Sequence, residues 1–208
     1  MSDVIRLPKS SSQSRNWSTE IHTELLRKSL HLLISMVPSM ARWNFGFTVA
    51  LLASGILVYA YSEYLRLQGF EVVIISKITS MAARRRDAGR FVMGPVTLGL
   101  GALLALVLYP EPAASIAIYA LAFGDGLSSL VGKSFGNIRL PFTGGKSLEG
   151  SLTCLIAVFC SAYALSRNAW RSFLIALIAT VIEAFPTKDA DNLLLPSLVG
   201  LFAVYLFP

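Results

Sequence analysis

Seven apolar stretches alternate with polar stretches along the chain. A helix that crosses a bilayer needs about 20 residues, and two of the uncharged runs have 20 residues each, whereas the others have 11 to 16. The shorter runs reach spanning length only if flanking polar residues join the helix. The pattern predicts an all-α fold, a polytopic membrane bundle of about seven transmembrane helices. The runs are Ser29–Ala41, Trp43–Ser62, Phe91–Pro110, Pro112–Gly124, Ser151–Ser166, Ser172–Ile182 and Leu193–Phe207.

The composition supports the membrane class. Of the 208 residues, 54% are hydrophobic and only 14% are charged, whereas soluble domains carry about 25% charged residues. The first residues, 1–17, are polar and rich in serine, which predicts a mobile N-terminal tail. The remainder, 18–208, is predicted to form one integral membrane domain, because its length leaves no room for a separate soluble domain.

The distribution of charge predicts the orientation. With the N-terminus in the cytoplasm, 15 of the 18 Lys and Arg residues fall on the cytoplasmic side, and only Arg42, Arg167 and Arg171 fall outside. This agrees with the positive-inside rule. Of the 12 acidic residues, 11 are also inside, with Glu111 as the exception. The net charge of +6 then indicates topology and contact with anionic membrane lipids, not nucleic acid. We expect the polar chemistry of the protein to lie on the cytoplasmic face of a bacterial inner membrane or of an internal membrane.

One polar segment has the pattern of an interfacial amphipathic helix. Apolar residues recur at helical spacing between Phe70 and Met81, and the basic residues Lys77 and Arg84 to Arg86 occupy the other side and the C-terminal end. Such a helix anchors a protein to anionic lipid headgroups. A share in binding nucleotide phosphates is the alternative.

The ends of three short runs carry ionisable residues that favour a shared cavity. Glu24, Arg27, Lys28 and His31 are spaced i, i+3, i+4 and i+7, so they lie on one helix face. Ionisable groups are costly in lipid, so we expect them to face a water-accessible cavity. Its mixed charge suits a metal ion with phosphates. Each piece also has an ordinary explanation, such as an i,i+4 salt bridge or snorkelling to headgroups. The expected cavity residues are Glu24, Arg27, Lys28, His31, Asp125, Glu183, Asp189 and Asp191.

Two Gly-Lys-Ser triplets invite comparison with a P-loop. The P-loop needs a glycine five positions before the glycine of the triplet, and those positions hold Leu127 and Leu140. The P-loop is therefore excluded. Glycines still let backbone N–H groups approach an anion, and lysines neutralise phosphate oxygens. We expect a long cytoplasmic loop over Asp125–Gly150 to bind a triphosphate through Gly124, Gly126, Gly132, Lys133, Gly136, Lys146 and Ser147.

Hard oxygen ligands accompany these motifs. Asp125, Asp191 and Asn192 supply carboxylate and carboxamide oxygens, which suit Mg²⁺ because this ion binds one or two carboxylates together with substrate phosphates.

Taken in order, the motifs resemble those of the membrane CTP-dependent lipid kinases, a family that includes dolichol kinase, phytol kinase and the fungal-type diacylglycerol kinase. The resemblance covers residues 24–196. One departure is the stretch Asp189-Ala190-Asp191-Asn192, where the family often has two adjacent acids before Asn. The motifs are Glu24-x-x-Arg27-Lys28-x-x-His31, Gly124-Asp125-Gly126 with Gly132 and Gly136, Gly145-Lys146-Ser147-x-Glu149-Gly150-Ser151, Glu183-x-x-Pro186 and Asp191-Asn192-x-x-x-Pro196.

The resemblance implies transfer of the γ-phosphate of CTP to the hydroxyl of a membrane lipid alcohol, with a divalent cation. Arg27 and Lys28 would stabilise charge on the phosphoryl group, and Glu24, His31 and Glu183 are three candidates for the base that accepts the hydroxyl proton. Glu149 is expected to orient Lys146. Phytol, polyprenol, shorter isoprenoids and diacylglycerol all fit an apolar cleft.

Two other functions stay open at this stage. Phosphatidate cytidylyltransferase is similar in its use of CTP, metal and lipid, but it transfers CMP to a lipid phosphate. Charged residues and glycines within membrane helices also mark transporters. Transporters often have repeated halves with sites near the midplane, whereas here the charges gather toward one face.

Overall fold

The computed structural model describes residues 24–70, 89–141, 143–185 and 190–208. Within these ranges the regular structure is helical and there is no β-strand. An isolated antiparallel β-bridge pairs Arg139 with Ser147. The apolar runs predicted from the sequence are largely helical, although a turn at Ser35 and Met36 divides the run Ser29–Ala41 between two helices. The elements are a helix at residues 24–34, α2 (Val37–Trp43), α3 (Phe45–Leu67), α5 (Gly94–Leu108), α6 (Ala113–Tyr119), the π-helical turn η2 (Ala120–Asp125), α7 (Gly126–Ser134), α8 (Leu148–Ser166), α9 (Ala169–Ala184) and α10 (Asp191–Leu206).

Three continuous helices are long and apolar enough to cross a bilayer, so this is a membrane protein. They are Phe45–Leu67, Ala113–Ser134 and Leu148–Ser166, and α5 and α10 are shorter apolar helices. The predicted N-terminal tail, the amphipathic helix beyond Phe70 and Asp189 lie outside the described residues. The predicted total of seven spans and the predicted orientation of the N-terminus remain predictions.

Side-chain caps define where several helices begin. The side chain of Asn44 accepts a hydrogen bond from the N–H of Phe47 at 2.9 Å, and that of Asn168 accepts one from Arg171 at 3.0 Å. Ser147 does the same for Gly150 at 3.2 Å, at the start of α8. Each bond satisfies one of the N–H groups that the first helical turn leaves without a partner.

The helix Ala113–Ser134 contradicts the predicted loop after Asp125. We expected Asp125–Gly150 to be a loop, but the helix continues through α7 to Ser134, and the connection to α8 covers only residues 135–147. The helical turn that ends at Asp125 is a π-helix, in which the backbone hydrogen bond skips one additional residue. The glycines of this stretch therefore lie mostly within a helix and serve packing.

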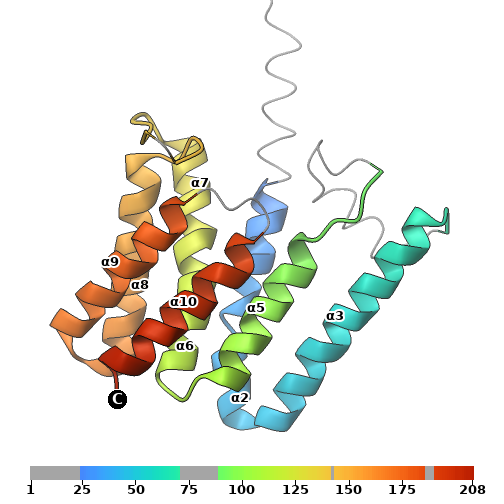
Figure 1. The fold of residues 1–208 in the computed structure, drawn as a ribbon, viewed down its shortest axis with the longest axis horizontal. Coiled ribbons are helices and arrows are strands. Elements are labelled where there is room, and N and C mark those ends of the chain that lie inside the picture. Colours follow the sequence, from blue (N-terminus) through green and yellow to red (C-terminus); the bar gives the residue numbers. More distant parts are fainter. Residues whose placement is uncertain (1–23, 71–88, 142, 186–189) are drawn as a thin grey trace, which may run out of the picture.

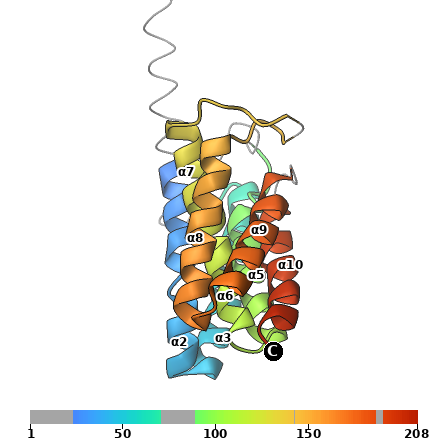
Figure 2. The same ribbon diagram turned by 90° about the vertical axis from the view of Figure 1, so that its left-hand side faces the viewer.

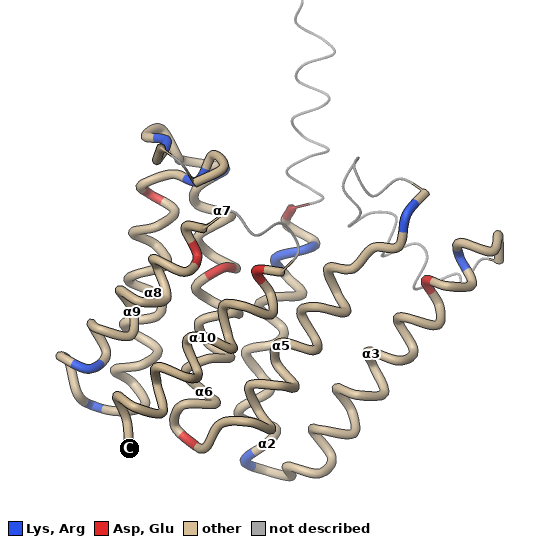
Figure 3. Tube along the Cα trace, in the orientation of Figure 1, with Lys and Arg blue, Asp and Glu red and all other residues tan. Residues whose placement is uncertain are grey.

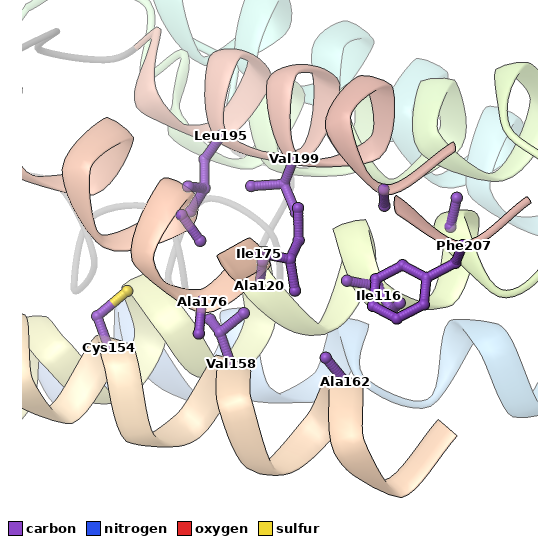
Figure 4. Close-up of a cluster of buried hydrophobic side chains, with 13 residues drawn as sticks. Ile116, Ala120, Cys154, Val158, Ala162, Ile175, Ala176, Leu195, Val199 and Phe207 are labelled. Carbon is purple, nitrogen blue, oxygen red and sulfur yellow. The ribbon is translucent and has the colours of Figure 1, made fainter. Parts of the chain in front are cut away.

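This continuous helix is the centre of the bundle. In Figure 1, α8 and α9 lie on one side of α6 and α7, and α5 and α3 lie on the other. Figure 2 shows the same bundle turned by 90°. Figure 4 shows the main apolar cluster, in which Ile116 and Ala120 of the central helix meet Val158 of α8, Ile175 of α9 and Val199 of α10. A second cluster joins α6 to α5 and α2 through residues such as Ile118, Leu106 and Val37.

The charged residues gather near the two ends of the bundle, with an uncharged band between them among the described residues (Figure 3). At the end where α6 begins, α2 carries Arg42 in its last turn, Glu111 precedes α6, and Arg167 and Arg171 lie where α8 meets α9. The opposite end carries the remaining described charges. This matches the asymmetry predicted from the sequence.

The outer helix α3 is held at this more charged end by a buried carboxylate. Glu63 is 1% exposed; it accepts hydrogen bonds from the guanidinium of Arg66 at 2.6 and 2.8 Å, and from the N–H of Val92 at 2.8 Å. Tyr59 also donates to the carbonyl of Val92 at 3.1 Å. These bonds join the end of α3 to the residues just before α5.

Candidate active site

The polar ends of five helices and one connection meet in a pocket of about 270 Å³. Helix 24–34, the central helix, α8, α9 and α10 all contribute, together with the connection between α7 and α8. The charged lining comprises five cations and four anions, namely Arg27, Lys28, Lys133, Arg139 and Lys146 with Glu24, Asp125, Glu183 and Asp191. The predicted mixed-charge cavity is thus present in the structure.

The first helix presents its polar face to this pocket. Glu24, Lys28 and His31 are 5%, 3% and 3% exposed, which confirms that they share one buried face. Glu24 is paired with Arg27 at 3.2 Å and with Lys133 of α7 at 2.6 Å. Lys28 is paired not with Glu24 but with Asp125. The Glu24–Arg27 pair lies within one helix, whereas the pairs Glu24–Lys133 and Lys28–Asp125 join different helices.

Asp125 of the central helix is contacted by two side chains of helix 24–34. Its Oδ2 lies 2.6 Å from Nζ of Lys28 and 3.1 Å from Nδ1 of His31, and its Oδ1 lies 3.3 Å from the hydroxyl of Ser129. The π-helical turn ends at Asp125. Such turns are frequent at functional sites, because they change the direction in which side chains project. His31 is buried beside Asp125 and does not line the pocket.

Glu183, near the end of α9, forms the opposite side. Its Oε1 accepts hydrogen bonds from the hydroxyl of Ser128 at 3.0 Å and from the ammonium of Lys146. Its Oε2 is buried and has no hydrogen-bond partner within the described parts of the chain. Burial acts against the charge of Lys146, but the carboxylates of Glu183 and Asp125 outweigh it, so the pKa of Lys146 lies above its ordinary value. Lys146 is therefore a cation at neutral pH.

The connection between α7 and α8 brings backbone and side-chain donors to the pocket. It folds back on itself through hydrogen bonds from the N–H of Leu140 to the carbonyl of Lys146, and from the N–H of Leu148 to the carbonyl of Ile138. Gly144 and Gly145 have φ values of 67° and 98°, which favour glycine. As a result Ser147, Gly150 and Ser151 at the start of α8 line the pocket. A helix N-terminus of this kind attracts anions.

The predicted role of Glu149 as a partner of Lys146 is wrong. Its Oε1 accepts hydrogen bonds from the N–H groups of Asn137 and Ile138 at 2.9 and 3.3 Å, at the beginning of the connection, while Lys146 is paired with Glu183. In the first turn of α8 the carboxylate of Glu149 points back toward the chain that precedes the helix, so it fixes the connection instead.

Of the four glycines predicted to bind nucleotide, one lines the pocket and three do not. Gly132 lines the pocket, whereas Gly124, Gly126 and Gly136 do not. A Cβ atom on Gly124 would lie 3.0 Å from the side chain of Val158, and one on Gly136 would lie 2.2 Å from the carbonyl of Gly132. These two glycines are required for close packing of the chain against itself and against α8.

Two of the predicted metal ligands face the pocket. Asp125 and Asp191 both line it, and the carboxylate of Asp191 has no cationic partner within the described residues. The carboxamide of Asn192 instead donates to the carbonyl of Gly94 at 3.3 Å and to the hydroxyl of Thr97 at 3.1 Å, toward α5. The described residues contain no group of three His, Cys, Asp or Glu side chains that could hold a metal ion by itself. Two carboxylates still fit Mg²⁺, which completes its shell with phosphates and water.

Several lining residues were missed by the sequence reasoning. Arg139 reaches the pocket from the connection, where its guanidinium donates to the carbonyl of Gly145 at 2.8 Å. Ser128 and Ser129 reach it from α7. The serines follow Asp125 at helical spacing, a signal that was lost because this stretch was interpreted as a loop.

A second, mostly apolar pocket of about 310 Å³ adjoins the first between α9 and α10. Four residues line both pockets, namely Asp125, Lys146, Glu183 and Asp191. The other residues that line the second pocket are Ile182, Phe185, Leu194, Leu195 and Leu198. A charged site and an apolar site therefore share one boundary of ionisable side chains.

Comparisons with known proteins found plant phytol and farnesol kinases that are similar to this chain. A probable chloroplastic phytol kinase of Triticum aestivum is 27% identical over 207 residues, which cover 90% of this chain and 69% of the relative. Phytol kinase 1 of Arabidopsis thaliana is 25% identical, with 89% and 67% covered. The farnesol kinase of the same plant is 27% identical, with 88% and 65% covered.

No family model matches the chain, and no solved structure matches it. The sequence relatives nevertheless agree with the motifs. The homologues of this chain are thus phytol and farnesol kinases, which supports the lipid-kinase family that its motifs resemble.

Proposed function

We propose that this membrane protein is a kinase that transfers the γ-phosphate of a nucleoside triphosphate to the hydroxyl of an isoprenoid alcohol. The observation that carries the proposal is the shared boundary of the two pockets. A charged pocket suited to a triphosphate and an apolar pocket suited to a lipid meet at Asp125, Lys146, Glu183 and Asp191. The relatives with kinase names support phosphoryl transfer over transfer of CMP or transport.

The cations of the charged pocket are the proposed triphosphate ligands. Arg139 has no carboxylate partner within the described residues, and Lys133 is more than half exposed beside Glu24. Together with the first turn of α8 they offer charge and N–H donors to phosphate oxygens. Phosphoryl transfer depends mainly on such positioning and neutralisation of charge. The choice of CTP as the donor rests on the family resemblance.

Asp125 and Asp191 are the proposed ligands of the divalent cation, which we take to be Mg²⁺. When bound, Mg²⁺ neutralises phosphate charge. Lys28 also approaches the pocket beside Asp125. We assign Lys28 and Arg27 to the stabilisation of charge on the phosphoryl group.

Glu183 is the proposed acceptor of the hydroxyl proton. Among the three candidates from the sequence, Glu24 is paired with two cations and lines only the charged pocket, and His31 lines neither pocket. Glu183 lines both pockets, and one of its buried oxygens has no donor among the residues that the structure describes. In the proposed step the alcohol oxygen forms a bond to the γ-phosphorus, the bond to the leaving nucleoside diphosphate breaks, and the proton passes to Glu183.

A purified-protein assay tests the function and this assignment together. With CTP and farnesol or phytol, the wild-type protein is expected to form the lipid monophosphate and CDP. Glu183→Gln is expected to lower kcat by about 10²- to 10⁴-fold, the usual range for a general base. Glu149→Gln is the matched control, because Glu149 holds the connection and does not line either pocket.

Two outcomes would contradict the proposed function, and a third would contradict the assignment of Glu183. Release of pyrophosphate with CMP transferred to phosphatidic acid would make the protein a cytidylyltransferase. Uptake of a solute by proteoliposomes without nucleotide, with no kinase activity, would make it a transporter. Unchanged kcat in Glu183→Gln would exclude Glu183 as the base and leave the kinase activity itself unaffected.

We also propose that the site lies on the cytoplasmic face, or on the corresponding face of an internal membrane, because the charges gather at that end of the bundle. The curated relatives are described as chloroplastic. Labelling of Cys residues introduced at Arg139 and at Arg171, in sealed vesicles with a reagent that does not cross the membrane, is expected to modify only one of the two positions. Modification of both positions would contradict this topology.

A further inference from the structure

The second pocket, which the proposed function gives to a lipid, has a lining and a position that bear on which lipid it binds and how that lipid enters. It lies between α9 and α10, and beyond the four shared ionisable residues the described residues that line it are all aliphatic or aromatic. Its volume of about 310 Å³ is at the lower end of the range for small-molecule sites, about 300–1,000 Å³. It is large enough for the head and first part of one hydrocarbon chain.

The outer rim of this pocket is open to the surroundings of the bundle. Phe185, Leu194 and Leu198 are 63%, 40% and 36% exposed, although all three line the pocket. Leu195, which forms its inner wall, is 2% exposed. A chain bound inside therefore has a lateral exit between α9 and α10, at the surface that faces lipid when the helices span a membrane.

The inner end of the pocket supplies the polar groups that a hydroxyl needs. Glu183 is buried there, with a side chain that is 2% exposed and an Oε2 atom without a hydrogen-bond partner within the described parts of the chain. A buried polar atom without a partner is costly, and the hydroxyl of an alcohol is a donor of the right kind. The charged pocket begins on the other side of the same residue.

We infer that this pocket binds one acyclic isoprenoid alcohol, which enters sideways from the membrane between α9 and α10 with its hydroxyl at Glu183, and that it rejects diacylglycerol. The inference rests on the proposed kinase function. Diacylglycerol carries two chains and two ester carbonyls next to its hydroxyl. Among the described residues that line the pocket, the apolar side chains offer those carbonyls no donor, and the ammonium of Lys146 is already paired with Glu183. A single branched hydrocarbon chain requires none. The same geometry predicts that lengthening the tail beyond the rim adds little to recognition, because the additional units lie in lipid.

A bulky side chain at the rim tests the site. Leu198→Trp is expected to raise the KM for farnesol about tenfold or more, the usual effect of losing an apolar contact, with the KM for CTP unchanged. Leu201→Trp is the matched control, since Leu201 lies on the same helix, is 45% exposed and does not line the pocket. It is expected to leave both KM values unchanged. If the two variants give the same KM for farnesol, the inference is wrong.

A labelling experiment tests the site without turnover. A farnesol analogue with a diazirine near its hydroxyl is irradiated with the wild-type protein in lipid vesicles, and the labelled residues are identified by mass spectrometry. Labels within Ile182–Phe185 or Leu194–Leu198 are expected, and excess farnesol, but not excess diacylglycerol, is expected to prevent them. Labels confined to other helices, or equal competition by diacylglycerol, would overturn the inference. A wild-type protein that phosphorylates no alcohol would overturn the proposed function, and the labelling result would still decide the site.

Discussion

The central helix Ala113–Ser134 and the outer helix α3 are alike in sequence statistics and opposite in environment. They have 22 and 23 residues, and an 18-residue stretch of each has a mean hydropathy of 1.5 and 1.6, respectively. In the central helix 67% of that stretch is buried in the protein, whereas in α3 only 11% is buried. The difference lies in side-chain size. The central helix places Ala113, Ala117 and Ala120 against its neighbours, whereas α3 directs large side chains such as Leu57 and Tyr61 outward. Lipid is as apolar as a leucine side chain, so close packing of small residues decides which helix is central.

Each of these two helices also buries one carboxylate near the more charged end. Asp125 binds Lys28 of another helix and lines both pockets, whereas Glu63 binds Arg66 of its own helix and the backbone of Val92. Buried charges of this kind are paired in both cases, as expected within a membrane. Pairing alone therefore does not identify a functional residue; contact with a pocket does.

The largest effect expected from this comparison is on kcat, which should fall on substitution of Asp125 but not of Glu63. Asp125→Asn is expected to lower kcat at least about 10²- to 10³-fold, the effect of removing one electrostatic contact to a transition state. Glu63→Gln, its matched control, is expected to keep the wild-type kcat and KM values. Turnover by the purified variants with CTP and farnesol is the measurement. Activity of Asp125→Asn within threefold of the wild type would remove Asp125 from the catalytic site.

The next effect concerns packing at the centre. A Cβ atom on Gly150 would lie 2.8 Å from the carbonyl oxygen of Ser128, a backbone atom that has little freedom to move. Gly150→Ala is therefore expected to destabilise the protein by about 1–3 kcal/mol through overpacking. The melting temperature in detergent, followed by loss of the monodisperse peak in gel filtration, measures this. A melting temperature equal to that of the wild type would show that α7 and α8 are not tightly packed.

Glu63→Gln is expected to have a smaller effect on stability. The carboxamide oxygen still accepts from the N–H of Val92, but the charge that holds Arg66 is lost. A hydrogen bond to a charged group contributes about 1.5–3 kcal/mol, and the surviving bond keeps the loss near the lower value. The same melting measurement applies, with Arg66→Gln as a second variant. The two losses should not add, because both variants break the same pair.

The smallest expected effect is on the outer helix. A Cβ atom on Gly55 meets nothing within 4 Å. Gly55→Ala is expected to leave activity unchanged and to raise stability by no more than about 1 kcal/mol, the difference in helix propensity between the two residues. A loss comparable to that of Gly150→Ala would show that a partner covers this face of α3.

Much of the fold follows from local pattern. The uncharged runs predicted where the apolar helices lie, because apolar length and bounding charges are properties of the sequence itself. The run Pro112–Gly124, however, covers only the first part of the helix Ala113–Ser134. The spacing of Glu24, Lys28 and His31 predicted one buried polar face, since helical periodicity fixes which residues share a face. The convergence of Asp125, Glu183 and Asp191 was predicted because ionisable groups in a membrane need a common polar site.

What the sequence did not determine depends on contacts between distant segments. Glycines between Gly124 and Gly136 predicted a loop, but close packing against α8 makes most of that stretch helical, since glycine permits both outcomes. The salt-bridge partners of Lys28, Lys133 and Lys146 are 97, 109 and 37 positions away. From the sequence, an i,i+4 salt bridge between Glu24 and Lys28 was one ordinary explanation, and Glu149 was expected to orient Lys146.

The sequence by itself thus determined that the chain is a membrane bundle with its polar chemistry at one end, because hydropathy and charge act locally. Only the tertiary structure decided which helix is central, which cation neutralises which acid, and that the charged pocket adjoins an apolar one at Glu183. The physical reason is that side-chain size and pair geometry take effect only where helices meet. Two helices of equal hydropathy are distinguished by what packs against them.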